Sequence, residues 1–134
     1  MKSSLISIVD DDPFVRQATD ALVRSLGYRA ATFASAEDFL QSSYIVHGTT
    51  CLISDVQMPG LSGVDLQREL IAQGYRTPII FITAFPDERI CRKVMEAGAI
   101  GYLTKPFDEK SLLQHLRIAF AASDDADSPR HEVR

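Results

Sequence analysis

Polar side chains that can do chemistry follow four apolar runs of this 134-residue chain, at the point where each run ends. In chain order they are Asp10-Asp11-Asp12, Asp55, Thr83 and Lys105. Carboxylates without a neighbouring Cys or His favour a hard cation such as Mg²⁺. A cation, an amine and a hydroxyl beside a carboxylate can stabilise a phosphoryl group during its transfer. The residue types therefore point to phosphoryl chemistry.

Asp55 is the best candidate nucleophile, because it stands alone at the end of its run, opposite the acidic cluster. Attack of its carboxylate on phosphorus would form an acyl phosphate, which is labile but persists long enough to signal. Each residue also has an ordinary structural interpretation when it is taken alone. The acids before Pro13 can cap a helix, and a single Lys is most often a solvated surface residue. The four positions in order favour a shared functional site.

The elements that must position these residues alternate along the chain. Apolar runs predict strands, and segments with helical spacing of apolar residues predict helices between them. The strands are predicted at 5–9, 28–33, 51–54, 79–82 and 100–103, and the helices at 13–26, 36–40, 64–73, 86–97 and 109–120. This alternation predicts an α/β fold with a doubly wound five-stranded parallel sheet in the order 2-1-3-4-5, which is flavodoxin-like. Ligands of such sheets bind beyond the carboxyl ends of the strands.

Details of three segments are also predicted from the pattern. Phe14, Ala18, Leu22 and Leu26 recur at helical spacing and are the apolar residues that predict the first helix. The second helix is short and is predicted to fray at 41–43. From about residue 122 the chain loses its apolar period. We therefore predict one domain at 1–121 and a flexible tail, or the start of an interdomain linker, at 122–134.

Composition limits the function classes. The chain has 14 Lys and Arg against 18 Asp and Glu, a formal net charge of -4, which argues against direct binding of nucleic acid by this segment. Apolar runs are too short for a membrane span, and the first residues do not fit a signal peptide. The two cysteines, Cys51 and Cys91, suggest neither a zinc site nor a disulfide. A cytoplasmic protein is expected.

Four strings at the strand ends together resemble the signatures of response-regulator receiver domains. They are Ile8-Val9-Asp10-Asp11, Asp55-Val56-Gln57-Met58-Pro59-Gly60, Ile82-Thr83-Ala84 and Lys105-Pro106-Phe107. The resemblance covers about residues 4–121 and is closest to receivers that precede LuxR-type helix-turn-helix output domains. It implies that Asp55 is the phosphoacceptor and that a sensor histidine kinase is the phosphodonor. It also implies a cis peptide bond between Lys105 and Pro106.

The resemblance further implies roles for the other residues of the site. Asp10 and Asp11 would hold Mg²⁺, or Mn²⁺ in its place, together with Asp55 and the backbone carbonyl of Gln57. Thr83 and Lys105 would sense and neutralise the phosphate, while Asp12 has no evident role. The domain would load and lose its phosphoryl group by itself, as a signalling switch and not as an enzyme with an external substrate.

The resemblance also implies how the signal leaves the site. Thr83 would move toward the phosphoryl group, and Tyr102 would move into the space that Thr83 leaves. The responding surface, formed by the fourth predicted helix, the fifth strand and the fifth helix, would mediate dimerisation or contact a partner; it carries Arg89, Arg92, Lys93, Tyr102 and Phe107. Gln57 and Phe85, two residues past Asp55 and Thr83, would tune the phosphoryl lifetime by steering or excluding water.

Alternative functions remain open at this point. A phosphohydrolase of the haloacid dehalogenase type also pairs Asp with Mg²⁺, but it carries a DxDxT motif after the first strand, where this chain has Asp10-Asp11-Asp12-Pro13-Phe14. A flavodoxin-like flavin module would need a phosphate-binding loop there, and the acids would repel its phosphate. As a receiver, the chain is either the regulatory part of a transcription regulator, with DNA contacted only through a downstream domain, or a stand-alone regulator that docks a protein.

Overall fold

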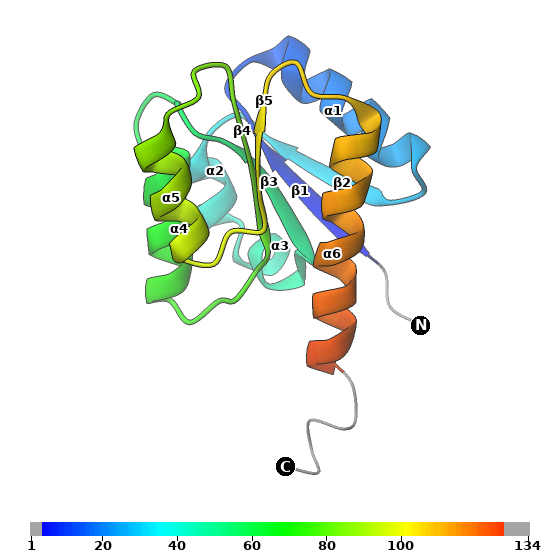
Figure 1. Cartoon of the computed structure of the whole chain (residues 1–134). Helices are drawn as coiled ribbons and strands as arrows, with labels where there is room; N and C mark the ends of the chain where they lie inside the picture. Colours follow the sequence, from blue (N-terminus) through cyan, green and yellow to red (C-terminus); the bar gives the residue numbers. More distant parts are fainter. Residues whose placement is uncertain (1–3, 128–134) are drawn as a thin grey trace.

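The computed structural model describes residues 4–127, which fold around one parallel sheet with the strand order β2-β1-β3-β4-β5 (Figure 1). This order and the α/β class confirm the sequence prediction. The strands are β1 Leu5–Val9, β2 Arg29–Phe33, β3 Cys51–Asp55, β4 Ile79–Thr83 and β5 Gly101–Thr104. The helices are α1 Pro13–Ser25, α2 Ala36–Gln41, α3 Ser43–Gly48, α4 Gly63–Ala72, α5 Glu88–Glu96 and α6 Glu109–Asp127.

Helices cover both faces of the sheet. Figure 1 shows α1 and α6 on one face and α2 to α5 on the other. Successive strand residues point to opposite faces, so the core divides in two. Ile8 and Ile53 belong to the cluster under α1 and α6, whereas Val9 and Leu52 belong to the cluster under the other helices. The three central strands, β1, β3 and β4, are buried along their whole length, which explains their near-continuous apolar sequences.

The strand register brings the predicted site residues to one edge. Val9 pairs with Ser54, so Asp10 and Asp55 leave the sheet at the same level. Asp55 in turn pairs with Ile82, immediately before Thr83, and Thr83 pairs with Thr104, immediately before Lys105. The four strand ends therefore deliver their polar residues to adjacent positions at the carboxyl end of the sheet.

Two helices differ from the sequence prediction. Fraying was predicted at 41–43, and α2 does end at Gln41, but residues 43–48 form a further helix, α3, whose buried Val46 packs in the core. In α1 the buried residues are Thr19 and Val23, whereas Phe14 is 82% exposed. The apolar spacing correctly predicted a helix, and Leu22 and Leu26 pack against the core, but the buried positions are Thr19 and Val23. The small Thr19 can lie against the sheet because its hydroxyl donates to the carbonyl of Val15.

The carboxyl end of the chain also differs from expectation. Helix α6 continues to Asp127, although a tail was predicted from residue 122. A helix that is already formed extends at small cost and needs no apolar face to do so. The rest of the predicted tail, 128–134, lies outside the described residues. Within residues 4–127, no helix combines the length and apolarity that crossing a membrane requires.

Candidate functional site

Backbone hydrogen bonds continue past the strand ends and fix the start of each site segment. The amide of Asp10 donates to the carbonyl of Phe33 at 3.1 Å, and the amide of Val56 donates to the carbonyl of Ile82 at 3.0 Å. The amide of Lys105 donates to the carbonyl of Thr83 at 2.8 Å, and the following Lys105–Pro106 peptide bond is cis, as the resemblance implied. Asp10, Asp55 and Lys105 therefore project from backbone that the sheet itself holds.

Lys105 is shared by two buried carboxylates. Its Nζ lies 3.1 Å from Oδ2 of Asp10 and 3.2 Å from Oδ2 of Asp55. The exposed fraction of the side chain is 15% for Lys105, 1% for Asp10 and 7% for Asp55. One positive charge thus faces two negative charges in a poorly hydrated site, so the site has an excess of negative charge before Asp11 is counted.

Asp10, Asp11 and Asp55 form a cluster that can hold a cation. Each offers a carboxylate oxygen, and these oxygens lie within 4.8 Å of one another. Oδ2 of Asp10 is buried and accepts no hydrogen bond, although Lys105 lies beside it as an ion-pair partner. An unsatisfied buried carboxylate oxygen is costly unless a cation completes its coordination. The donor set, made only of oxygens, fits Mg²⁺ or Mn²⁺.

The pKa values of Asp55 and Lys105 reflect this imbalance. Burial, followed by the charge of Asp10, raises the pKa of Asp55 to about 6, and the attraction of Lys105 offsets only part of this increase. For Lys105, burial acts to lower the pKa, but the ion pairs with Asp10 and Asp55 outweigh it and raise the pKa above its usual value. Lys105 is therefore a permanent cation, and Asp55 is mainly ionised at neutral pH.

The segment after β1 is held by local capping. The side chain of Asp12 accepts hydrogen bonds from the amides of Phe14 and Val15 and is the N-cap of α1. Asp10 accepts the amide of Asp12 at 2.9 Å through its other oxygen, Oδ1. Arg16, which the sequence analysis did not single out, donates to the carbonyl of Asp10 at 2.7 Å. Asp12 therefore has a structural role that explains why the acidic run is longer than the cation cluster.

Thr83 is not directed to Asp55 by its hydrogen bonds. Its buried hydroxyl donates to Oε1 of the Gln57 side chain at 2.7 Å and accepts the amide of Phe85 at 3.0 Å. Gln57 lies on the exposed loop after β3, two residues past Asp55. The side chain of Phe85 is 71% exposed. The two residues predicted to tune the phosphoryl lifetime both contact Thr83.

The loop between β3 and α4 is fixed by two residues that the sequence analysis missed. Gly63 lies so close to the carbonyl of Asp55 that a Cβ there would overlap that oxygen. Glu37, from α2, accepts the amide of Leu61 at 3.0 Å and also borders Gly60, whose φ is +75°. Ser62 preceding Gly63 could have indicated where α4 starts, because it caps that helix, but not the close approach of Gly63 to Asp55. No sequence signal links Glu37 to a loop 24 residues away.

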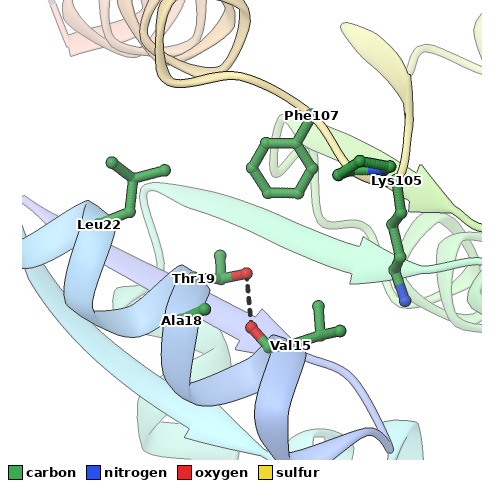
Figure 2. A pocket seen from close by; sticks show the side chains of 7 residues that line it. Val15, Ala18, Thr19, Leu22, Lys105 and Phe107 are labelled. Atoms are coloured by element: carbon green, nitrogen blue, oxygen red, sulfur yellow. Dashed lines mark hydrogen bonds between the residues drawn. The ribbon is translucent and has the colours of Figure 1, made fainter.

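Tyr102 and Phe107 lie on different sides of the molecule. The hydroxyl of Tyr102 accepts the amide of Asp87, the N-cap of α5, at 3.2 Å. Phe107 instead faces α1 across a cavity of about 450 Å³ (Figure 2). The cavity is lined by Val15, Ala18, Thr19, Leu22, Lys105, Pro106 and Phe107. Phe107 was expected on the surface formed by α5, β5 and α6; the structure corrects this, because the loop after β5 turns toward α1.

Comparison with known families identifies the family of the chain. The response regulator receiver domain matches residues 6–117, a range that contains every strand end described above. The chain belongs to the response regulator receiver domain family. It is the receiver domain of a two-component response regulator, a signalling domain, in agreement with the resemblance seen in its motifs.

Relatives of this receiver domain support the assignment. The response regulator protein TmoT of Ectopseudomonas mendocina is 46% identical over 119 residues, which are 88% of this chain and 53% of TmoT. The transcriptional regulatory protein TdiR of Thauera aromatica is 35% identical over 89% of this chain and 52% of its own length. The solved structure of the response regulator StyR has a TM-score of 0.84 at 36% identity, covering 97% of this chain and 65% of StyR. The receiver domain thus spans about half the length of these two sequence relatives.

Proposed function

We propose that Asp55 accepts a phosphoryl group from a sensor histidine kinase and that this modification is the signal of the receiver domain. The observation that carries the proposal is the position of the Asp55 carboxylate, which contacts Lys105 and lies within the Asp10 and Asp11 cluster. An oxygen of Asp55 would attack phosphorus, and the phosphorus–nitrogen bond of the phosphohistidine would break. The electron pair of that bond returns to the imidazole, and Asp55 becomes an acyl phosphate.

Asp10, Asp11 and Asp55 would hold Mg²⁺ or Mn²⁺, with the backbone carbonyl of Gln57 as a further ligand. Two observations support this: the carboxylate oxygens converge, and Oδ2 of Asp10 is buried without a hydrogen bond. A bound divalent cation supplies positive charge that offsets the charge of the phosphoryl oxygens. The chain itself supplies the geometry, because Asp10 and Asp55 come from paired strands.

Lys105 and Thr83 would bind the phosphoryl group after transfer. Lys105 already contacts Asp55, so its ammonium would meet the new phosphoryl oxygens with little movement. The hydroxyl of Thr83 would donate to another of these oxygens. Loss of the group occurs by attack of water, and we propose that Gln57 and Phe85 set its rate by flanking the site. If replacing Phe85 with Asn left the phosphoryl lifetime unchanged, Phe85 would have no such role.

The signal would leave through the surface formed by α5, β5 and α6, called the α5–β5–α6 face below. Phosphorylation adds close to two negative charges and three acceptor oxygens at Asp55. As Thr83 turns toward them, Tyr102 would move inward and release its hydrogen bond with Asp87. The face, with its exposed residues Arg89, Arg92 and Lys93, would then bind a second copy of the domain.

For the whole protein, we propose regulation of transcription. TdiR is described as a transcriptional regulatory protein, and the domain spans about half of it. DNA would be contacted only through a downstream domain, because this segment carries a net charge of -4. The protein would then act in the cytoplasm, where it would encounter both the kinase and the DNA. The alternative is a stand-alone regulator that docks a protein; the reading frame beyond Arg134 distinguishes the two.

The test of phosphorylation is intact-mass analysis of the full chain after treatment with acetyl phosphate and Mg²⁺. We expect an adduct of about 80 Da, the mass of one phosphoryl group, on the wild type and on Asp20→Ala, an acid outside the site, but not on Asp55→Ala. In size-exclusion chromatography with BeF₃⁻ and Mg²⁺, the wild type and Asp20→Ala should elute as dimers, and Asp55→Ala should not. Absence of the adduct, or its persistence in Asp55→Ala, would refute the proposal.

A second measurement separates a receiver from a phosphohydrolase. A receiver takes one phosphoryl group per chain, and the label decays with the lifetime of the acyl phosphate. A phosphohydrolase of the haloacid dehalogenase type would release phosphate from a generic phosphate ester over many turnovers. We expect stoichiometric labelling and no sustained release from p-nitrophenyl phosphate.

A further inference from the structure

We infer that the side chain of Gln57 holds the switch hydroxyl of Thr83 in the unmodified domain and must release it before Thr83 can bind the phosphoryl group. This inference rests on the proposed phosphorylation of Asp55 and adds a residue that opposes it. Gln57 is a positioning residue here: it acts on the equilibrium of the switch through Thr83 and leaves the transfer chemistry to Asp55.

The argument depends on the number of protons that a hydroxyl carries. A threonine hydroxyl has one proton to donate and two lone pairs that accept. In this structure the proton goes to Oε1 of Gln57 at 2.7 Å, and the amide of Phe85 occupies a lone pair. At neutral pH the phosphoryl oxygens are mostly deprotonated and act as acceptors, so Thr83 must donate its proton to them. The Gln57 amide and the phosphoryl group therefore compete for the same proton.

The position of the bond makes this competition effective. Thr83 is fully buried at the end of β4, whereas Gln57 extends from the exposed loop that follows Asp55. The hydrogen bond thus joins the loop after β3 to the loop after β4. Two further hydrogen bonds hold the second loop: the amide of Phe85 donates to the hydroxyl of Thr83, and the amide of Asp87 donates to the hydroxyl of Tyr102. Release of Thr83 by Gln57 would therefore remove one of the contacts that hold that loop.

This role differs from control of the phosphoryl lifetime. A residue that steers water changes the rate of hydrolysis and leaves the binding of a non-hydrolysable mimic unchanged. A residue that holds Thr83 in the unmodified state changes the binding of that mimic. A neutral hydrogen bond contributes about 1 kcal/mol net, so its loss should strengthen binding about fivefold.

The experiment compares BeF₃⁻ affinity, in saturating Mg²⁺, of the full chain with that of Gln57→Met. Methionine has a similar length but cannot accept the proton as an amide oxygen does, and it keeps the backbone carbonyl. We expect Gln57→Met to bind BeF₃⁻ about fivefold more tightly than the wild type does. Unchanged or weaker BeF₃⁻ binding would overturn the inference.

A double-mutant cycle shows whether Gln57 acts through Thr83. In a Thr83→Ala background the hydroxyl is gone, so Gln57→Met should no longer change BeF₃⁻ affinity. An effect of the same size in both backgrounds would assign Gln57 a general structural role and overturn the inference. If wild-type protein did not bind BeF₃⁻ at all, or Asp55→Ala still bound it, the proposed function itself would fail.

A measurement without any phosphoryl mimic distinguishes failure of the inference about Gln57 from failure of the proposed phosphorylation. Three-bond NMR couplings across χ1 of Thr83 report whether its side chain occupies one rotamer. We expect a single rotamer in the metal-free wild type and averaging over rotamers in Gln57→Met. A single rotamer in both proteins would overturn the inference, whatever the domain does with BeF₃⁻.

Discussion

Lys105 contacts Asp55 with Nζ 3.2 Å from Oδ2, although 50 residues of chain separate them. The same ammonium lies 3.1 Å from Asp10, so the contact is one half of a shared ion pair. Sharing leaves both carboxylates incompletely neutralised, which agrees with the raised pKa of Asp55. Lys105 therefore holds the acidic site together and also opposes any further cation that enters it.

Replacement of Lys105 by Met should strengthen Mg²⁺ binding. Removal of one positive charge from the acidic cluster lowers the repulsion that a divalent cation meets, and we expect an affinity gain on the order of tenfold. Phosphorylation by acetyl phosphate should become slower, because the phosphoryl oxygens lose their ammonium partner. Calorimetric titration with Mg²⁺ measures the first effect. Lys110→Met, which removes an exposed charge on α6, should change neither Mg²⁺ affinity nor the phosphorylation rate. Weaker Mg²⁺ binding in Lys105→Met would contradict the argument.

The stability of the metal-free domain should respond to pH through Asp55. The pKa of Asp55 is raised to about 6 in the folded state, above its ordinary value of 3.8, so the folded state holds this proton more tightly than the unfolded state. The contribution of Asp55 to stability is therefore fully present below pH 3.8 and is lost as the pH rises through about 6. In EDTA, Asp55→Asn should become increasingly more stable than the wild type over that range.

Urea unfolding at several pH values measures this difference, and Mg²⁺ should remove it by stabilising the wild type. Asp108→Asn provides a control of opposite sign. The hydrogen bond that Asp108 accepts from the backbone of Ser111 lowers the pKa of Asp108. The ionised carboxylate therefore stabilises the folded state at pH values above its unfolded pKa, and this stabilisation is lost as the pH falls. A free energy difference for Asp55→Asn that stayed constant with pH would contradict the buried, charge-crowded environment of Asp55.

The sequence was sufficient to predict the sheet, its order and the meeting of Asp10, Asp55, Thr83 and Lys105 at one edge, because strand ends in a parallel sheet share a direction. It failed where packing competes with pattern. In α1 the polar Thr19 lies inside and Phe14 outside, which apolar spacing cannot show. It also missed the partner of Thr83, because side-chain hydrogen bonds between two loops leave no periodic signal. Both types of error concern contacts between elements and not the elements themselves.

Replacement of Gly63 by Ala should destabilise the domain and disturb the site. A Cβ at this position would overlap the carbonyl of Asp55 and press on the ring of Phe81, so α4 must move away from the end of β3. Overpacking of this kind costs about 1–3 kcal/mol of unfolding free energy. Urea unfolding and Mg²⁺ titration should both show the loss. Gly48→Ala is the matched control, since a Cβ there meets nothing within 4 Å and should cost little.

Replacement of Glu37 by Ala should loosen the loop that joins Asp55 to α4. The carboxylate accepts the amide of Leu61 at 3.0 Å, and loss of this charge-assisted hydrogen bond at a half-buried position should cost about 1–2 kcal/mol. Hydrogen exchange of the Leu61 amide should accelerate by about five- to thirtyfold, the factor that corresponds to that energy. Glu37→Gln keeps an acceptor oxygen and should restore most of the protection.

Asp38→Ala separates this contact from the general effect of charge at the start of α2. Glu37 and Asp38 both lie in the first turn, where an acid interacts favourably with the helix dipole. The side chain of Asp38 is exposed, and removing it should lower stability slightly without accelerating exchange at Leu61. If Glu37→Ala and Asp38→Ala accelerated that amide equally, the effect would come from the stability of α2, and Glu37 would not hold the loop. Acceleration confined to Glu37→Ala would show that α2 contributes to positioning the segment after Asp55.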